Sequence, residues 1–523
     1  MAVGACRQSN FPCRTPYLAE LRIVEKQGRY EEVLMTTTAT KQYQQFIGGH
    51  RAGAVGGGTF EDKDPFTGDT FAVVSAGGAE DAKAAVAAAS AAFPGWAKTT
   101  PGERQRLFLT AASILERRGQ EVVDVLARET GCTFGFGMFQ LGFTTGLLKQ
   151  AASLGYLPIG QIIPSDMPGA LAMGIREPVG VVGAIAPWNA ALILSLRSIT
   201  SPIAFGNTVV LKPSEWSPVA GGLIWGEIFE EAGFPAGVLN IVPHAPGAAA
   251  PIADVLVADP AVRRLNFTGS VATGRKLAEA AGRHLKRVVL ELGGFNPLIV
   301  LDDADIDYAV DAAAFGSFLH QGQICMSVRR VLVQRSVADA FTEKLTAKVR
   351  NFKLGDPKEH DTIIGPLINA DAVANVDRRV QAAVAGGARV LLGGAADGTC
   401  YQATIVTDVP AGSELAESET FGPVVAVEIV DDDESAVKRA NATPYGLSAG
   451  IITTDNGRGL DMARQIQAGI VHVNDQPVGD EPQMPFGGVK DSGWGRFGGA
   501  AAMDEFTELR WVTVQSGTRP FPF

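Results

Sequence analysis

The sequence predicts an α/β protein built on parallel sheets, because buried strand signals alternate with helical segments along most of the chain. Between residues 179 and 290, short runs rich in Val, Ile and Leu are separated by helical stretches such as 219–232. A second alternating block extends from 296 to 474. Strands that alternate with helices form a parallel sheet covered on both faces. A chain of 523 residues is too long for one ordinary core, so we expect two or three domains.

An Ala-rich segment before these blocks predicts two helices. It extends from residue 79 to 128 with helical periodicity, and it is interrupted by Phe93-Pro94-Gly95 and Pro101-Gly102. Because proline and glycine end helices, we expect the second helix to cover 104–128.

The alternating blocks give a specific list of elements. The first block has expected strands at 179–186, 207–211, 238–241, 264–267 and 287–290. The second block begins with a strand at 296–301 and ends with one at 470–474, with helices near 305–319, 337–349 and 371–385.

Two segments predict a β arm outside the main sheets. Extended runs at 160–164 and 170–173, with turn residues between them, indicate a hairpin. The tail at 505–514 has strand character and too little following sequence to form its own domain. We expect it to pair with another strand, such as the hairpin arm of its own or a neighbouring subunit, and we expect a homodimer or homotetramer.

Composition excludes several function classes. A hydrophobic content of 46% with 19% charged residues is typical of a globular protein with a large core. The formal net charge of −11, without clustered Lys and Arg, argues against nucleic acid or an anionic membrane as a partner. The stretch 190–210 is interrupted by Arg197, Pro202 and Gly206, so we expect no transmembrane helix. Five scattered cysteines without metal-ligand spacing indicate no metal site and a reducing, cytoplasmic setting.

Residues 1–34 differ from the rest of the chain. They contain two cysteines and mixed charges but no apolar core of the kind that a secretory signal needs. Met35 opens a plausible start of the folded protein. We expect a disordered leader or a translation start placed too far upstream. A native N-terminus at residue 1 or 2, found by intact mass, would reject the second alternative.

Cys325 and Glu291 are candidates for a nucleophile and its base. Cys325 follows an apparent helix that ends in a glycine turn, and the strand-like run 330–333 comes next. A thiol at such a junction can face a cleft and react as thiolate, although a lone cysteine is more often a core residue. Glu291 ends the strand-like run 287–290, where a carboxylate is more often solvated or salt-bridged than catalytic.

Four short motifs fall at the ends of expected strands, where an α/β protein binds its ligands. Each is weak alone, and their joint position is what indicates a site. They are Ala186-Pro187-Trp188-Asn189, Lys212-Pro213-Ser214-Glu215, Phe267-Thr268-Gly269-Ser270 with Gly274, and Glu291-Leu292-Gly293-Gly294.

Together with Gly322-Gln323-Ile324-Cys325, Glu419-Thr420-Phe421-Gly422-Pro423 and Pro485-Phe486-Gly487-Gly488, these motifs resemble the NAD(P)-dependent aldehyde dehydrogenase superfamily in order and spacing. The sequences of 322–327 and of the tail 497–511 are most similar to those of aromatic aldehyde dehydrogenases of the vanillin, salicylaldehyde and benzaldehyde kind.

The resemblance implies an aldehyde dehydrogenase-like fold with two parallel-sheet α/β domains and a small β bridging arm. The implied division is an NAD-binding domain at 35–156 and 179–290, a catalytic domain at 291–484, and bridging or oligomerisation segments at 157–178 and 485–523.

The resemblance also implies a mechanism. Cys325 as thiolate would attack the aldehyde carbon, and the Asn189 amide with the Cys325 backbone N–H would hold the oxyanion. The thiohemiacetal would pass a hydride to nicotinamide and leave a thioester. Glu291 would then activate the water that releases the acid.

The same family pattern assigns the cofactor residues. Lys212 and Glu215 would bind the adenosine ribose, and a carboxylate at 215 favours NAD over NADP because it would repel a 2′-phosphate. Glu419 would bind the nicotinamide ribose beside Phe421. The remaining cofactor candidates are Trp188, Gly269, Ser270, Gly274 and Leu292, of which Gly269 and Ser270 would lie beside the pyrophosphate.

Three positions depart from the family pattern or leave alternatives open. Ser198 stands where a lysine is usual, so a proton relay falls to water or to Glu508, which can equally be an edge-strand carboxylate. Phe295 also stands in place of a usual lysine. Arg197 either contacts a ring hydroxyl, phenolate or carboxylate of the substrate or forms a structural salt bridge. A succinate semialdehyde dehydrogenase and a non-catalytic nucleotide-binding relative are the alternative functions.

Overall fold

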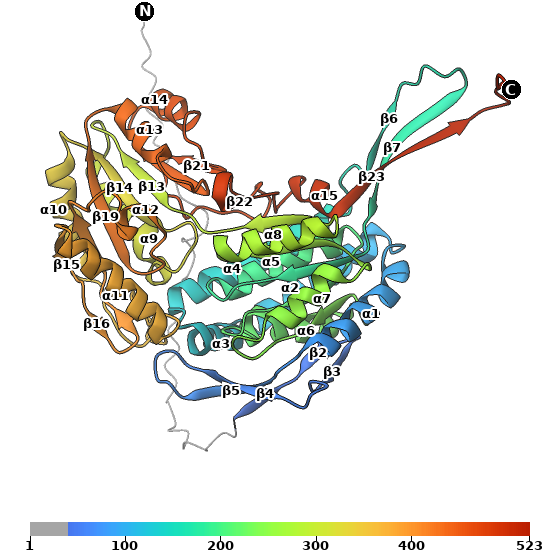
Figure 1. Ribbon diagram of the computed structural model, residues 1–523, viewed down its shortest axis with the longest axis horizontal. Helices are drawn as coiled ribbons and strands as arrows, with labels where there is room; N and C mark the ends of the chain where they lie inside the picture. Colours follow the sequence, from blue (N-terminus) through green and yellow to red (C-terminus); the bar gives the residue numbers. More distant parts are fainter. Residues whose placement is uncertain (1–39) are drawn as a thin grey trace, which may run out of the picture. The chain divides into compact units, whose positions relative to one another are not determined.

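The computed structural model describes residues 40–523, so the expectation for residues 1–34 lies outside it (Figure 1). Across that described range, no helix is long and apolar enough to cross a membrane. Two large sheets organise this part of the chain, and each has its own layers of helices.

The first sheet has eight strands in the order β22-β12-β11-β8-β9-β10-β2-β3. Its five central strands are parallel, as predicted: β8 (Val181–Ile185), β9 (Thr208–Lys212), β10 (Leu239–Ile241), β11 (Val262–Thr268) and β12 (Arg287–Glu291). The edge strands β2 (Gln45–Ile47), β3 (His50–Ala52) and β22 (Gly493–Trp494) pair antiparallel. The chain order changes direction between β8 and β11, and such a switch point opens a ligand crevice at the carboxyl ends of the strands.

Alternating side chains of this sheet pack into two separate hydrophobic clusters. In β8, Val182 and Ala184 join one cluster, whereas Val181 and Ile185 join the other. This period of two is the mark of a strand buried on both faces. One face is covered by α2 (Pro101–Arg117), α4 (Phe134–Leu154), α5 (Ala191–Ala204) and α6 (Ile224–Ala232), and the other by α1 (Ala79–Trp96), α7 (Ala250–Ala258) and α8 (Val271–Arg283).

The expected helix at 104–128 is in fact two helices, α2 and α3 (Gly119–Thr130). Arg118, with φ −89° and ψ 10°, ends one and caps the other, and its guanidinium pairs with Glu121 and Glu227 at 2.8 and 2.6 Å. The expected split between the two helical segments is present and lies at 97–100, because α1 continues through Pro94 and ends at Trp96, and α2 begins at Pro101.

The second sheet has seven strands in the order β15-β18-β19-β14-β13-β20-β21, parallel except for β15. Helices lie on both faces, including α9 to α11 near the predicted positions (Figure 1). The strands are β13 (Asn296–Val300), β14 (Val328–Gln334), β15 (Arg389–Leu392), β18 (Thr404–Thr407), β19 (Val424–Val430), β20 (Ser448–Ile452) and β21 (Ile470–Val473). The helices are α9 (Ile306–Phe318), α10 (Ala338–Val349), α11 (Ala370–Ala385), α12 (Glu414–Glu417), α13 (Asp433–Asn441) and α14 (Asn456–Ala463).

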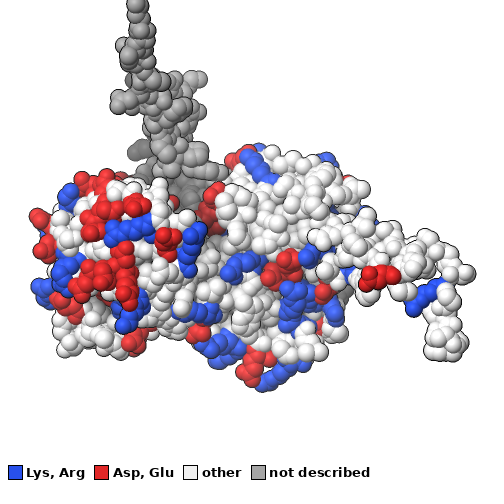
Figure 2. Space-filling view, turned by 90° about the horizontal axis from the view of Figure 1, so that it is seen from above, with Lys and Arg blue, Asp and Glu red and all other residues white. Residues whose placement is uncertain are grey.

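The predicted β arm is a three-stranded antiparallel sheet of β6 (Gly160–Ile163), β7 (Ala170–Pro178) and β23 (Thr507–Gln515). The tail therefore pairs with the hairpin of its own chain. In Figure 1 the arm extends away from the first sheet, and in Figure 2 few charged side chains appear on it. Short elements complete the fold: β1 (Lys41–Tyr43), β4 (Thr59–Lys63), β5 (Thr70–Ser75), β16 (Ala396–Asp397), β17 (Cys400–Tyr401) and α15 (Ala501–Phe506).

Candidate active site

Cys325 lies in the loop that enters β14, and this loop has an unusual backbone. His320, Gln321 and Gly322 have φ angles of 50°, 55° and 68°, a left-handed run that non-glycine residues rarely adopt. A Cβ at Gly322 would lie 2.2 Å from the carbonyl oxygen of Gly422, so only glycine fits there. Cys325 itself is partly exposed. Surrounding structure must hold such a backbone, and functional sites are where it occurs.

Two buried side chains hold this loop by its carbonyl groups. Arg329 donates to the carbonyl oxygens of Gly322 at 2.5 Å and Ile324 at 3.1 Å, and Asn296 donates Nδ2 to Cys325 O at 2.8 Å and to Ser327 O at 2.9 Å. Sequence reasoning missed both residues. A charged residue within a run otherwise typical of a buried strand was the available signal for Arg329.

Asn189 approaches the same loop from the first sheet. It follows β8, is 5% exposed, and donates Nδ2 to the carbonyl oxygen of Gln323 at 3.0 Å. A primary amide carries two N–H groups, so one remains after this bond. The end of β8 and the nucleophile loop are thereby brought together.

Glu291 ends β12 and is 2% exposed, and neither carboxylate oxygen has a hydrogen-bond partner within residues 40–523. Burial raises its pKa well above the usual range, and the charges of Arg197 and Arg496 oppose that rise. A Cβ at Gly487 would lie 2.7 Å from Oε1, so the Pro-Phe-Gly-Gly motif leaves room for this carboxyl. A buried, unpaired carboxyl with a raised pKa is typical of a general base.

The Cys325 thiol also carries a raised pKa. Burial raises it to about 12, the charges of Glu419 and Glu291 add to the rise, and Arg197 opposes it. Because the thiolate is the reactive form, this thiol needs a base that takes its proton when substrate is present.

The residues at the ends of β9 and β11 test whether a nicotinamide dinucleotide fits. Lys212 is 5% exposed, its Nζ contacts His244 Nε2 at 2.5 Å and Pro213 O at 3.2 Å, and burial lowers its pKa to about 8. A buried ammonium near Glu215 without a direct carboxylate partner suits ribose hydroxyls. Ser270 caps α8, whose N-terminus favours an anion such as pyrophosphate. The donor set therefore fits the cofactor.

Close contacts also position the remaining cofactor candidates. A Cβ at Gly274 would lie 2.5 Å from Leu292, and Gly269 N–H bonds Glu291 O at 3.0 Å. Phe421 has a φ of 53° and meets Trp188 edge-on, with ring centroids 5.6 Å apart. Burial raises the pKa of Glu419 to about 7, opposed by Arg329 and by the Gly294 N–H at 3.4 Å.

The proton-relay candidate Glu508 has a partner other than the thiol, and Ser198, which stands in place of the usual lysine, is bonded within its own helix. Ser198 Oγ donates to Ser195 O at 2.6 Å within α5 and is engaged in the helix. Glu508 lies on β23, about half exposed, where it pairs with Arg264. The relay role of Glu508 therefore gains no supporting contact, and its alternative as an edge-strand carboxylate matches its surroundings.

Arg197 is buried on α5 and pairs with Asp480, with Nη2 and Oδ2 2.5 Å apart. Its guanidinium also lies over the rings of Phe486 at 4.2 Å and Phe143 at 5.4 Å. The ion pair that was one alternative for Arg197 is thus present. Sequence reasoning missed Asp480.

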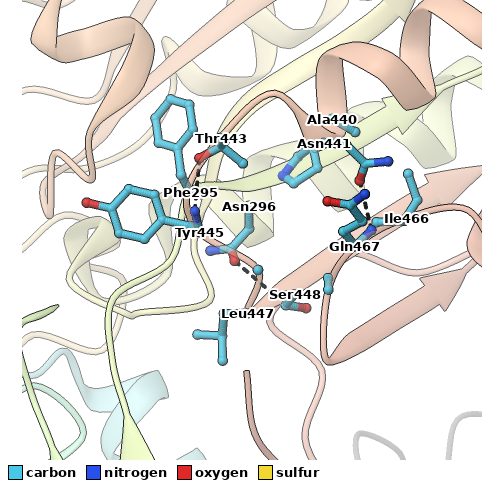
Figure 3. A pocket seen from close by; sticks show the side chains of 13 residues that line it. Phe295, Asn296, Ala440, Asn441, Thr443, Tyr445, Leu447, Ser448, Ile466 and Gln467 are labelled. Atoms are coloured by element: carbon cyan, nitrogen blue, oxygen red, sulfur yellow. Dashed lines mark hydrogen bonds between the residues drawn. The ribbon is translucent and has the colours of Figure 1, made fainter. Parts of the chain in front are cut away.

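Phe295 lies beside a buried guanidinium. The guanidinium of Arg330 lies 4.8 Å from the Phe295 ring and donates to Ala440 O at 2.7 Å, so a cation from β14 takes a place beside position 295. Figure 3 shows Phe295 beside Tyr445 in the pocket between β13 and α13. Asn296 lines the same pocket and accepts from Ser448 N–H at 3.1 Å (Figure 3). Its Nδ2 donates to the carbonyl oxygen of Cys325 in the loop before β14.

The fold and this site together define an oxidoreductase that works with a nicotinamide dinucleotide. The Aldehyde dehydrogenase family is matched over residues 53–512, and the chain belongs to this family. The predicted family, fold class, enzyme class and NAD(P) cofactor are thereby confirmed.

Similar proteins cover nearly the whole chain. The vanillin dehydrogenase of Pseudomonas fluorescens is 47% identical over 91% of this chain and 98% of its own length. The benzaldehyde dehydrogenase [NAD(+)] of Pseudomonas putida is 42% identical over 89% of this chain and 95% of its own. A solved salicylaldehyde dehydrogenase from Pseudomonas putida G7, complexed with salicylaldehyde, superposes with a TM-score of 0.90 at 39% identity, covering 92% of this chain and 100% of that one.

Proposed function

We propose that the chain catalyses NAD-dependent oxidation of an aromatic aldehyde to the carboxylic acid. The observation that carries the chemistry is that the Asn189 amide binds the loop of the partly exposed Cys325, while the unpaired carboxyl of Glu291 is near enough for its charge to act on the Cys325 thiol. The vanillin, benzaldehyde and salicylaldehyde dehydrogenases among similar proteins support the substrate class.

In this proposal, Glu291 removes the Cys325 proton, and the thiolate attacks the aldehyde carbon to form a thiohemiacetal. The free N–H of Asn189 and the backbone N–H of Cys325 stabilise the oxyanion, and one such donor contributes about 3 to 4 kcal/mol. When bound, NAD supplies the hydride acceptor. Glu291 releases the thiol proton to solvent before the second step. It then takes a proton from the water that attacks the resulting thioester and passes it to the leaving Cys325 thiolate, so that the acid leaves and the thiol is restored.

The cofactor would be held by residues already in place. Lys212 and Glu215 would bind the adenosine ribose, Ser270 at the start of α8 would lie beside the pyrophosphate, and Glu419 would bind the nicotinamide ribose. Phe421, against Trp188, flanks the ring. Glu215 favours NAD over NADP, since a 2′-phosphate would meet its charge.

We also propose that the protein is a cytoplasmic homodimer or homotetramer. We propose the domain division expected above with one change, because β22 of segment 485–523 adds a strand to the first sheet. The arm supports subunit contact because it exposes large apolar side chains, with Trp511 80% and Ile162 75% exposed. Exposed apolar surface of this kind marks a protein interface.

Steady-state rates test the proposal, measured over benzaldehyde, vanillin, salicylaldehyde and succinate semialdehyde with each cofactor. We expect the highest kcat/KM with an aromatic aldehyde and NAD. A preference for succinate semialdehyde would overturn the aromatic assignment. Cys325→Ala should abolish turnover while NAD binding is retained, whereas Cys400→Ala, a buried cysteine outside the site, should keep turnover. Turnover in Cys325→Ala would overturn the mechanism.

A further inference from the structure

The buried pair of Arg197 and Asp480 has an incomplete set of partners. Nη2 of Arg197 and Oδ2 of Asp480 are 2.5 Å apart, and the two side chains are 5% and 10% exposed. The other two atoms, Nη1 of Arg197 and Oδ1 of Asp480, have no hydrogen-bond partner within the described residues. A buried donor and a buried acceptor left open in one ion pair indicate a polar ligand, because unpaired buried polar groups are costly.

The pair also lies close to the reacting groups. The charges of both residues act on Cys325 and on Glu291, raising or lowering each pKa. Arg197 stacks over the ring of Phe486, and the next residue, Gly487, is in contact range of the Glu291 carboxyl. The pair is thus near enough to these groups to interact with an aldehyde that reaches Cys325.

Given the proposed function, on which this inference rests, we propose that Asp480 is a specificity-determining residue that admits an uncharged ring hydroxyl and refuses a second carboxylate on the aldehyde. Asp480 cancels the guanidinium charge. A ring hydroxyl then accepts from Nη1 of Arg197 and donates to Oδ1 of Asp480, which satisfies both open atoms without adding charge.

An aldehyde that carries a distal carboxylate would bring two negative groups to one buried cation. One of them would remain uncompensated, and burying an unpaired charge is far more costly than burying a neutral polar group. Without Asp480, Arg197 alone would attract such a carboxylate through two N–H groups. A purely structural ion pair would not change the ranking of these substrates.

Asp480→Asn is the direct test, because asparagine keeps an oxygen for Arg197 Nη2 and removes only the charge. The ratio of kcat/KM for 4-carboxybenzaldehyde to that for benzaldehyde should rise about tenfold or more, the factor that corresponds to about 1.4 kcal/mol. The ratio for 4-hydroxybenzaldehyde to benzaldehyde should not rise. Asp431→Asn is the matched control, since Asp431 is bonded to Arg335 at 2.6 Å on the surface, and it should leave both ratios as in the wild type.

An unchanged carboxylated-to-plain ratio in Asp480→Asn would overturn the inference. If that variant turns over no aldehyde, calorimetry on the full chain measures the binding of terephthalate and benzoate instead. The affinity for terephthalate relative to benzoate should be higher in Asp480→Asn than in the wild type. An unchanged ratio of the two affinities would overturn the role of Asp480. Failure of the wild type to oxidise benzaldehyde would instead overturn the proposed function, so the two failures are distinguishable.

Discussion

A Cβ added at Gly293 would lie 2.3 Å from Oε2 of Glu419, so the loop after β12 leaves space for a carboxylate that comes from the second sheet. The contact joins the chain on either side of the site, because Gly293 links β12 to β13 and Glu419 precedes β19. The Gly-Gly pair in this motif is therefore a packing requirement for the proposed nicotinamide ribose ligand.

Gly293→Ala should displace Glu419 and weaken cofactor binding. The expected result is an increase in KM for NAD of about tenfold or more, equivalent to about 1.4 kcal/mol, with a smaller change in KM for the aldehyde. Gly282→Ala in α8, where a Cβ meets nothing within 4 Å, is the control and should keep the wild-type KM. Steady-state kinetics with NAD varied measures both, and equal effects of the two substitutions would contradict the assigned contact.

Asn296→Ala should lower both stability and turnover. It removes the side chain that donates to the carbonyl oxygens of Cys325 and Ser327. A buried carbonyl group left without a hydrogen bond lowers the free energy of unfolding by about 1 to 3 kcal/mol. The free energy of unfolding in urea and kcat are the measurements. Asn351→Ala removes an exposed side-chain hydrogen bond to the carbonyl oxygen of Ala347, and it should change neither the free energy of unfolding nor kcat. An unaltered kcat in Asn296→Ala would show that the loop keeps its conformation without this clamp.

Much of the fold follows from local sequence patterns. Hydrophobic runs located the parallel strands, and helical periodicity located the helices. The site motifs lie at the predicted strand ends. Those features depend on residues close together in the chain. The break at Arg118 was missed although Gly119 after it is a local break signal, whereas the bond of Arg118 to Glu227, 109 residues away, could not be read from the sequence.

The site was predicted less completely for the same physical reason. Family motifs indicated Cys325, Glu291 and Asn189 as the proposed catalytic residues, but the residues around them act through distant partners. Asp480 meets Arg197 across 283 positions, and Glu508 meets Arg264 across 244. A polar residue in one sequence does not reveal which distant group it will face once both are buried.

Glu215→Ala should relax cofactor choice. Removing the carboxylate removes its repulsion of a 2′-phosphate and its hydrogen bond to a ribose hydroxyl, so kcat/KM for NADP relative to NAD should rise about tenfold or more. Glu231→Ala, which breaks a surface pair with Arg117, is the control. A constant ratio would show that residues other than Glu215 set the preference.

Trp511→Asp should lower the mass of the proposed oligomer. A charge in place of an 80% exposed indole on β23 would have to be buried if this face meets another subunit, and an unpaired buried charge is costly. Sedimentation should give a smaller mass than for the wild type. Leu460→Asp on α14, replacing a side chain that is 50% exposed away from the arm, should leave the mass unchanged. The same mass for both variants would mean that the Trp511 face of the arm is not an interface.

Glu291→Gln should change how stability depends on pH. Burial raises the pKa of Glu291 well above its ordinary value of 4.5, so between these two values the folded state holds a proton that the unfolded state has released. The wild type therefore loses free energy of unfolding at this site as pH rises through that window, whereas glutamine has no proton to lose. Urea unfolding from about pH 5 to about pH 8 should show the difference between Glu291→Gln and wild type growing in favour of the variant. Other buried carboxyls, such as Glu129, titrate in both proteins and cancel in that difference. A difference that stays constant over this range would mean that Glu291 is ionised in the folded enzyme, and its role as a base with a raised pKa would then be wrong.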